Sequence, residues 1–226
     1  MLVAFAAIIG MFVGLLLPRV SPTIDKVTGG YLAVGEAASA LATLPVRADD
    51  APDHASSYER DAFGFRTTDD DGDGCDVRDE VLERDLSDVV HKNRYSCVVQ
   101  SGTLHDPYTG ADIEFTRGSG TSGAVQIDHV VALSDAWRSG AHAWGTATRV
   151  RFANDPANLL AVDGAANQDK GDAAADFWLP PDETYVCAYV ARQIGVKAAY
   201  GLSVTATEKD AMAKALAGCP GQSLPF

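Results

Sequence analysis

The hydrophobic and polar positions of the chain follow a helical period in one segment and a strand period in the next. Over residues 78–92 the helical period places five apolar side chains on one face: Val81, Leu82, Leu86, Val89 and Val90. Residues 97–118 instead alternate as two strands on either side of a turn with the sequence Asp-Pro-Tyr-Thr-Gly. These patterns predict a helix followed by a β-hairpin.

A second group of short elements follows in the middle of the chain. One strand is expected to end in Asp128 and His129, and residues 158–163 predict another strand after a helical insertion. Residues 164–178, directly after it, have a helical pattern. The order strand, strand, helix predicts a β-β-α unit.

The C-terminal part of the chain is predicted to be helical. Residues 184–201 form one amphipathic segment, and Thr205 and Glu208 have the spacing of a capping box that opens another helix. The fold class is therefore α+β: a central β-β-α unit with an added N-terminal helix and hairpin and with C-terminal helices.

The N-terminal segment differs from the rest in polarity. Its first seventeen residues carry no charge, a run that is short for a membrane-spanning helix of about 20 residues and long for the apolar part of a signal peptide. We expect residues 1–43 to be a hydrophobic signal or membrane-anchor segment. Residues 44–57, which are polar with two prolines, are expected to be a linker, and residues 58–226 the folded domain.

Composition limits the classes of function. With 226 residues, 46% of them hydrophobic, the chain can form one domain with a sizeable core. The formal net charge of −13 argues against attraction of polyanions over long distances. If the substrate is a nucleic acid, a bound cation has to help.

The four cysteines bear on both fold and location. They form no C-x-x-C pair, so a zinc site is weakly supported, and two disulfides fit better. Three connectivities exist, and we favour Cys75–Cys97 with Cys187–Cys219 because each closes a short loop; four unpaired thiols would suit a cytosolic protein. Although Arg19 and Lys26 after the apolar run favour a cytoplasmic location for the rest of the chain, we give the cysteines more weight. The folded domain is expected to be extracellular, or anchored to a membrane on its outer side.

An acidic run fits the template of a twelve-residue calcium loop. Four residues would supply side-chain ligands: Asp69, Asp71, Asp73 and Glu80. Gly74 stands at the invariant glycine position, but Asp76 stands where such loops have an apolar residue, and the preceding residues form no amphipathic helix. An extracellular calcium-binding surface module, with Ca²⁺ in this loop, is therefore the alternative function.

The β-β-α unit carries the side chains with the clearest chemistry. Asp128 and Asn167 could supply two oxygen ligands to one hard cation, and His129 has a suitable reference pKa for a base near neutral pH. Asn158 could hold the histidine-bearing loop by hydrogen bonding, and Lys170 could contact a phosphate oxygen. Taken singly, these residues are equally well explained as a strand cap, a core histidine, a turn residue and a solvated charge.

The blocks that contain these residues resemble a known family. They read "GCDVRDEVL", "SGTLHDPYTG", "VQIDHVVALSDAW" and "FANDPANLLAVDGAANQDKGD", within a resemblance that spans roughly residues 40 to 219. The sequence resembles the HNH (His-Asn-His) ββα-metal endonucleases, specifically exported actinobacterial-type proteins related to the C-terminal nuclease domain of GmrSD restriction enzymes. A catalytically inactive relative that acts as a binding domain is a third alternative.

The resemblance implies a metal-dependent endonuclease that hydrolyses DNA phosphodiester bonds with a single divalent cation, Mg²⁺ or Mn²⁺. It implies that His129 is the general base, that Asn158 is the middle Asn of the family name, and that Asp128 and Asn167 bind the metal. We further expect a disulfide-anchored turn to bring Arg78 towards the scissile phosphate.

Overall fold

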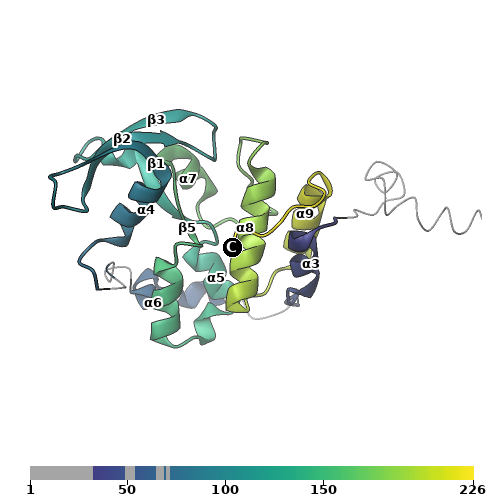
Figure 1. Ribbon diagram of the computed structural model, residues 1–226. Helices are drawn as coiled ribbons and strands as arrows, with labels where there is room; N and C mark the ends of the chain where they lie inside the picture. The colour runs from purple at the N-terminus through teal and green to yellow at the C-terminus, as the bar shows by residue number, and fades with distance from the viewer. Residues whose placement is uncertain (1–32, 49–53, 65–68, 70–71) are drawn as a thin grey trace, which may run out of the picture.

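The computed structural model describes residues 33–48, 54–64, 69 and 72–226 (Figure 1). Most of the predicted signal or membrane-anchor segment, residues 1–32, therefore lies outside the described residues. Within the described ranges, no helix is both long and apolar enough to cross a bilayer.

The centre of the fold is the predicted β-β-α unit. Strand β4 (Val125–His129) pairs antiparallel with β5 (Leu159–Asp163), and helix α7 (Gly164–Lys170) follows β5 directly and packs on both strands. Helices α5 (Leu133–Arg138) and α6 (Thr146–Asn154) form the insertion between the two strands. The chain thus places the end of β4 beside the helix that follows β5.

A three-stranded antiparallel sheet and one helix lie on one side of this unit. Its strands, in the order β1-β2-β3, are β1 (Leu86–His91), β2 (Val99–His105) and β3 (Asp112–Thr116). Helix α4 (Val77–Asp85) packs between this sheet and β5. The apolar side chains buried there come from all of these elements and from β4: Val81, Leu82, Leu86, Val99, Leu104, Phe115, Val125, Leu159 and Ala161. Each large aliphatic side chain removed from water stabilises the fold by roughly 1.5–3 kcal/mol.

Strand β1 corrects the sequence-based prediction of a helix over residues 78–92. The helix ends at Asp85, and the next six residues pair with β2, with register shifts on either side of Val90. The β-branched Val89 and Val90 favour extended backbone, and pairing with β2 satisfies backbone groups that a lone helix end would leave to water. Tertiary pairing therefore outweighs the local helical pattern.

The second half of the molecule is a helical layer. Helix α8 (Val186–Tyr200) packs against α9 (Ala206–Ala217) and against an N-terminal helix, α3 (Glu36–Thr43). The predicted capping box at the start of α9 is present. Short 3-10 helices connect other parts of the described chain: η1 (His54–Ser57), η2 (Arg60–Phe63), η3 (Ser122–Ala124) and η4 (Ala141–Ala143).

The folded body begins before the predicted domain boundary at residue 58. In α3, Ala37 and Leu41 are buried against the helical layer, Leu44 is buried just after it, and Val46 forms a parallel bridge with Val204. This stretch therefore differs from the expected anchor and linker. Small and apolar side chains of this stretch form one face of a packed helix.

Both favoured disulfides are present. Cys75 and Cys97 join the turn before α4 to the segment before β2, with their Cα atoms 5.9 Å apart. Cys187 and Cys219 join α8 to the residues after α9, at a Cα separation of 6.0 Å. The α+β, disulfide-stapled fold class predicted from the sequence is thus confirmed.

A buried ionic cluster holds α5, α8 and α9 together. The Nζ atom of Lys197 lies 2.8 Å from a carboxylate oxygen of Asp135 and 2.6 Å from one of Glu208, and all three side chains are almost fully buried. Burial alone would lower the pKa of Lys197, but the two carboxylates outweigh it and raise that pKa above its ordinary value. The lysine charge therefore compensates two carboxylates at once.

The variant Lys197→Met is expected to lower the free energy of unfolding by roughly 3–5 kcal/mol, because Asp135 and Glu208 lose their buried countercharge. Urea unfolding followed by circular dichroism measures the change. The matched control is Lys214→Met, at an exposed position of α9, which should shift the free energy of unfolding by less than about 0.5 kcal/mol. Equal urea midpoints for the two variants would contradict the role of Lys197 as the countercharge of Asp135 and Glu208.

Candidate active site

Strand β4 ends in two residues whose side chains point to opposite faces of the β4–β5 hairpin, as successive residues of a strand do. On one face, Asp128 contacts α7 through Lys170. On the other face, His129 contacts α6 through Ala153. Each face has its own set of polar partners.

Asp128 is the centre of a buried polar network. It is 5% exposed, and its two carboxylate oxygens accept hydrogen bonds from the Tyr108 hydroxyl at 2.6 Å and from the Lys170 ammonium at 2.9 Å. Lys170 also donates to the main-chain carbonyl of His129 at 3.0 Å. The network therefore connects β4 with α7 and with the turn between β2 and β3.

The electrostatics of this network follow from burial. Burial raises the pKa of Asp128, and the neighbouring Lys170 and Tyr108 offset part of that shift. Burial and then Asp128 raise the pKa of Tyr108 well above its ordinary value, so its hydroxyl keeps the hydrogen that it donates. Lys170 is 2% exposed, which differs from the solvent-facing position that a direct phosphate contact requires.

Asn167 lies on the same face as Asp128. Its Nδ2 donates to Oε1 of Gln126 at 2.9 Å, and Gln126 and Asp128 are two residues apart on β4. The donors gathered here are one carboxylate and amide oxygens, which suit a hard cation such as Mg²⁺ or Mn²⁺ that keeps several water ligands. Among the residues that the structure describes, no group of three His, Cys, Asp or Glu side chains is placed to hold a metal ion. Binding of a cation by Asp128 and Asn167 therefore stays a prediction.

The contact of His129 fixes its tautomer. Its Nε2 lies 2.8 Å from the carbonyl oxygen of Ala153. Because a carbonyl can only accept, the neutral ring carries its hydrogen on Nε2 and its lone pair on Nδ1. Burial lowers the pKa of His129 to about 4, although the Ala153 carbonyl opposes the shift. At neutral pH the ring is therefore uncharged, with Nδ1 as its basic atom.

His129 lines a pocket of about 130 Å³. Three charged side chains also line it, namely Arg60, Asp76 and Arg78, and the rest of its wall is formed mostly by apolar side chains: Val77, Ile127, Leu133, Ala153 and Leu159. A wall of low polarity strengthens the field of the two guanidinium groups inside the pocket. The pocket therefore combines a neutral histidine with positive charge.

The N-terminus of α4 positions Arg78. The Asp76 carboxylate caps the helix by accepting from the Arg78 backbone N–H at 2.7 Å, and the Cys75–Cys97 disulfide holds the preceding residue. One guanidinium nitrogen of Arg78 donates to the carbonyl of Val125 at 3.1 Å. Burial, and then the charge of Arg117, lowers the pKa of Arg78, whose guanidinium nevertheless stays charged. Arg78 and His129 thus line one pocket, and the approach of Arg78 to the scissile phosphate stays a prediction.

Asn158 connects the start of β5 to the chain that follows His129. Its side chain is fully buried, accepts from the backbone N–H of Val131 at 2.8 Å and donates to the carbonyl of the same residue at 3.2 Å. Its own carbonyl accepts from Val130. These bonds satisfy buried backbone groups next to His129 and fix their positions.

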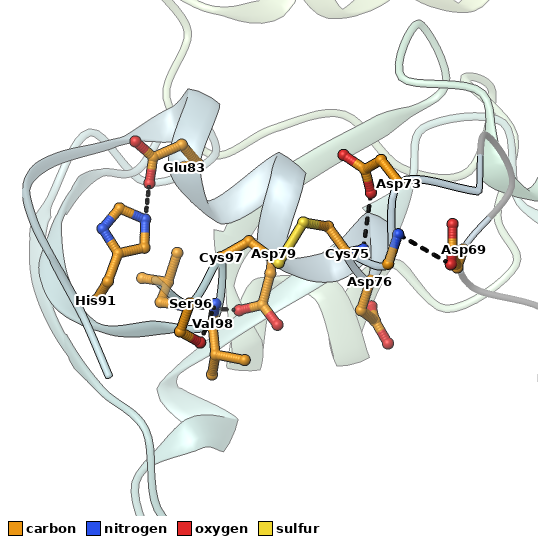
Figure 2. Close-up of a disulfide and its surroundings, with 12 residues drawn as sticks. Asp69, Asp73, Cys75, Asp76, Asp79, Glu83, His91, Ser96, Cys97 and Val98 are labelled. Atoms are coloured by element: carbon orange, nitrogen blue, oxygen red, sulfur yellow. Dashed lines mark hydrogen bonds and ion pairs between the residues drawn. A yellow bond between two sulfur atoms is a disulfide. The ribbon is translucent and has the colours of Figure 1, made fainter. Parts of the chain in front are cut away.

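The described residues of the acidic run lie ahead of α4 and are held by side-chain hydrogen bonds to backbone N–H groups (Figure 2). The Asp69 carboxylate accepts from the backbone N–H groups of Gly72 and Gly74, and Asp73 accepts from Cys75. Glu80 lies in the first turn of α4. Asp71 lies outside the described residues, so calcium binding by this loop stays a prediction.

Three polar residues of the site were missed in the sequence. Tyr108 stands in the block "SGTLHDPYTG", where the turn pattern gave no sign of a buried hydroxyl. Gln126 precedes Asp128 by two residues, so strand alternation alone places it on the same face. Arg60 had no signal, because the contact between η2 and α6 joins segments far apart in the chain.

Comparison with known proteins places these residues in a family. A family model described as the C-terminal domain of GmrSD restriction endonucleases matches residues 76–215. The chain belongs to this family. Membership in the GmrSD C-terminal domain family indicates a nuclease-related function and a nucleic acid as substrate. The matched range contains Arg78, Asp128, His129, Asn158, Asn167 and Lys170.

A similar protein comes from a fungus. The chain is 38% identical over 217 residues to an "Uncharacterized secreted protein" of Arthroderma benhamiae, a match that covers 95% of this chain and 98% of the fungal protein. No solved structure matches the chain. The similarity to the fungal protein therefore extends beyond residues 76–215, the part that matches the GmrSD C-terminal domain family.

Nuclear magnetic resonance of the metal-free protein, labelled with ¹⁵N at histidine, should record a midpoint near 4 for His129, because its buried ring resists charging. The unfolded chain protonates this histidine near pH 6.5, whereas the folded ring stays neutral down to about pH 4, so the folded state loses stability as the pH falls from about 6.5 towards 4. Above it, the spectrum should be that of the tautomer with hydrogen on Nε2. A midpoint at or above 6.5 would contradict the geometry.

Proposed function

We propose that the protein is a metal-dependent endonuclease of the HNH type that hydrolyses phosphodiester bonds of DNA, with His129 as general base. The observation that supports this most strongly is the back-to-back arrangement at the end of β4. A neutral histidine with its lone pair on Nδ1 lines a pocket with two arginines, and the adjacent Asp128 lies on the face of β4 that carries the hydrogen-bonded amides of Gln126 and Asn167.

His129 supplies the base. With a pKa of about 4 it is unprotonated at neutral pH, and Nδ1 can take a proton from a water molecule in the pocket. The Ala153 carbonyl holds Nε2 so that the ring stays in this orientation. Asn158 fixes the backbone that follows the histidine, which makes it a positioning residue. General base catalysis of this kind typically contributes about 10²- to 10⁴-fold in rate.

Asp128 and Asn167 are the residues that would hold Mg²⁺ or Mn²⁺. When bound, such an ion supplies positive charge that offsets the charge developing on the phosphate and on the leaving oxygen. Tyr108 and Lys170 hold the Asp128 carboxylate in one orientation, and Lys170 also fixes the carbonyl of His129. Lys170 therefore fixes the Asp128 carboxylate relative to the backbone of His129.

Arg78 and Arg60 bring positive charge to a chain of net charge −13. A guanidinium group matches two oxygens of a phosphate at once, so Arg78 is the residue we assign to the scissile phosphate. The local charge of the pocket compensates for the repulsion that the acidic molecule as a whole exerts on DNA.

The protein is placed outside the cytoplasm by this proposal. Two disulfides favour an oxidising compartment, and the similar fungal protein is named as secreted. Export through a hydrophobic segment within residues 1–32 fits both observations.

The test is cleavage of supercoiled plasmid DNA by the purified protein with Mg²⁺ or Mn²⁺ and with EDTA. Cleavage should require the divalent cation, and His129→Ala should slow it by about 10²- to 10⁴-fold because the general base is removed. The control His105→Ala changes an exposed histidine of β2 and should cleave at the wild-type rate. Equal rates for His129→Ala and wild type, or cleavage unaffected by EDTA, would overturn the proposal.

The variant Arg78→Ala is expected to reduce kcat/KM for plasmid cleavage by roughly 10- to 100-fold, the size of one lost charge-assisted hydrogen bond. Arg78→Lys keeps the charge but cannot donate two parallel hydrogen bonds to one phosphate, so its kcat/KM should lie between those of Arg78→Ala and the wild type. Thermal unfolding checks that each variant is folded. A folded Arg78→Ala that cleaves at the wild-type rate would remove Arg78 from the phosphate site.

A further inference from the structure

The loop between β1 and β2, residues 92–98, has a charge opposite to that of the whole chain. The protein has 31 acidic residues, yet no Asp or Glu occurs from residue 89 to residue 105. The loop carries Lys92 and Arg94, both exposed. In Figure 1 it lies at the outer end of the β1–β2 hairpin, away from the helical layer of α8 and α9. A basic loop on an acidic protein is a local site for a polyanion.

The same loop exposes an aromatic ring. Tyr95 is 81% exposed, and the guanidinium carbon of Arg94 lies 4.3 Å from the centre of its ring. The Arg94 guanidinium also donates to the Tyr95 hydroxyl. An aromatic ring beside a cation is the combination on which bases of a single strand stack while their phosphates are neutralised.

The loop is ordered before any ligand binds. The Asn93 side chain accepts from the backbone N–H of Tyr95 at 3.1 Å, and the Ser96 hydroxyl accepts from Val98 at 3.1 Å. The backbone N–H of Lys92 closes the loop on the carbonyl of Val98 at 2.9 Å. Binding to an ordered loop costs less conformational entropy than binding to a flexible one.

The Cys75–Cys97 disulfide connects this loop to the active-site pocket (Figure 2). Cys97 follows Tyr95 by two residues, and Cys75 precedes Arg78 by three. With the two Cys Cα atoms 5.9 Å apart, Tyr95 lies at most about 25 Å from Arg78. At the duplex spacing of 3.4 Å, this corresponds to about seven base steps. One DNA strand can therefore reach both.

We propose that the β1–β2 loop is a DNA-binding element, in which Tyr95 stacks on a base and Lys92 and Arg94 neutralise phosphates within about seven nucleotides of the scissile bond. The inference rests on the proposed endonuclease function, because the loop is a second contact for the DNA whose scissile phosphate is bound in the pocket of His129 and Arg78. It explains how an acidic protein retains a polyanion, and it gives the disulfide the role of setting the distance between the two contacts.

The first test measures binding to a fluorescein-labelled single-stranded DNA 20-mer by fluorescence anisotropy in EDTA, so that binding is read without cleavage. Tyr95→Ala should raise Kd by about tenfold, the usual size of one lost stacking contact. Tyr95→Phe keeps the ring and should stay within about twofold of the wild type. Equal Kd values for Tyr95→Ala and wild type would overturn the stacking role.

The second test separates charge from stacking. For the double variant Lys92→Ala/Arg94→Ala, the slope of log Kd against log salt concentration should fall by about 1.4, because each phosphate contact on a single strand contributes about 0.7. Lys214→Ala on α9 removes one exposed charge far from the loop and should leave the slope unchanged. An unchanged slope in the double variant would overturn the phosphate contacts.

The effect should depend on the length of the strand. A dinucleotide has a single phosphate and so cannot place one phosphate in the pocket and another at the loop, and the tighter binding of a 20-mer over a dinucleotide should therefore shrink in Tyr95→Ala and in the double variant. An identical gain with length in all three proteins would overturn the proposal. Plasmid cleavage decides the endonuclease function separately: wild-type protein that binds through the loop but does not cleave would overturn that function and leave the loop contact supported.

Discussion

The structure depends on the way one buried carboxylate is held. Asp128 is removed from water, and a charge in that position is tolerated only when it is paired and hydrogen-bonded. Its partners come from two separate parts of the chain, Lys170 on α7 and Tyr108 in the turn between β2 and β3. Their contacts fix the β-β-α unit against the three-stranded sheet. Since His129 is the next residue, the same contacts determine where its ring can lie.

The opposite side of the site is held by a covalent constraint. The Cys75–Cys97 disulfide and the Asp76 cap set the start of α4, and the helix start carries Arg78 into the pocket of His129. The two faces of β4 are thus supported by different means, a buried ion pair on one and a disulfide on the other. Catalytic groups need such support, because small displacements of a reacting group are costly in rate.

The sequence predicted those features that depend on neighbouring residues. β5, the start of α7 and the capping box at Thr205 follow from local periodicity and side-chain hydrogen bonding, and both disulfides follow from loop length. The helical pattern over residues 164–178 is wrong after Lys170, where α7 ends. Features that depend on distant partners were not predictable. Lys170 has the pattern of a surface helix charge, and its burial results from Asp128, forty-two residues earlier. Likewise the prediction of a helix over β1 is wrong, because its pairing with β2, a later segment of the chain, outweighs the helical spacing of its apolar residues.

The N-terminal helix α3 joins the two ends of the described chain. The backbone N–H of Ala37 donates to the carbonyl of Gln222, and that of Gly221 to the carbonyl of Val34. These two segments lie almost two hundred residues apart in the sequence, so the helical layer closes only when both are present. That layer includes Gln193 of α8, whose side chain donates to the carbonyl of Val130, one residue after His129. The support behind the backbone next to His129 therefore includes contacts between the two most distant parts of the described chain.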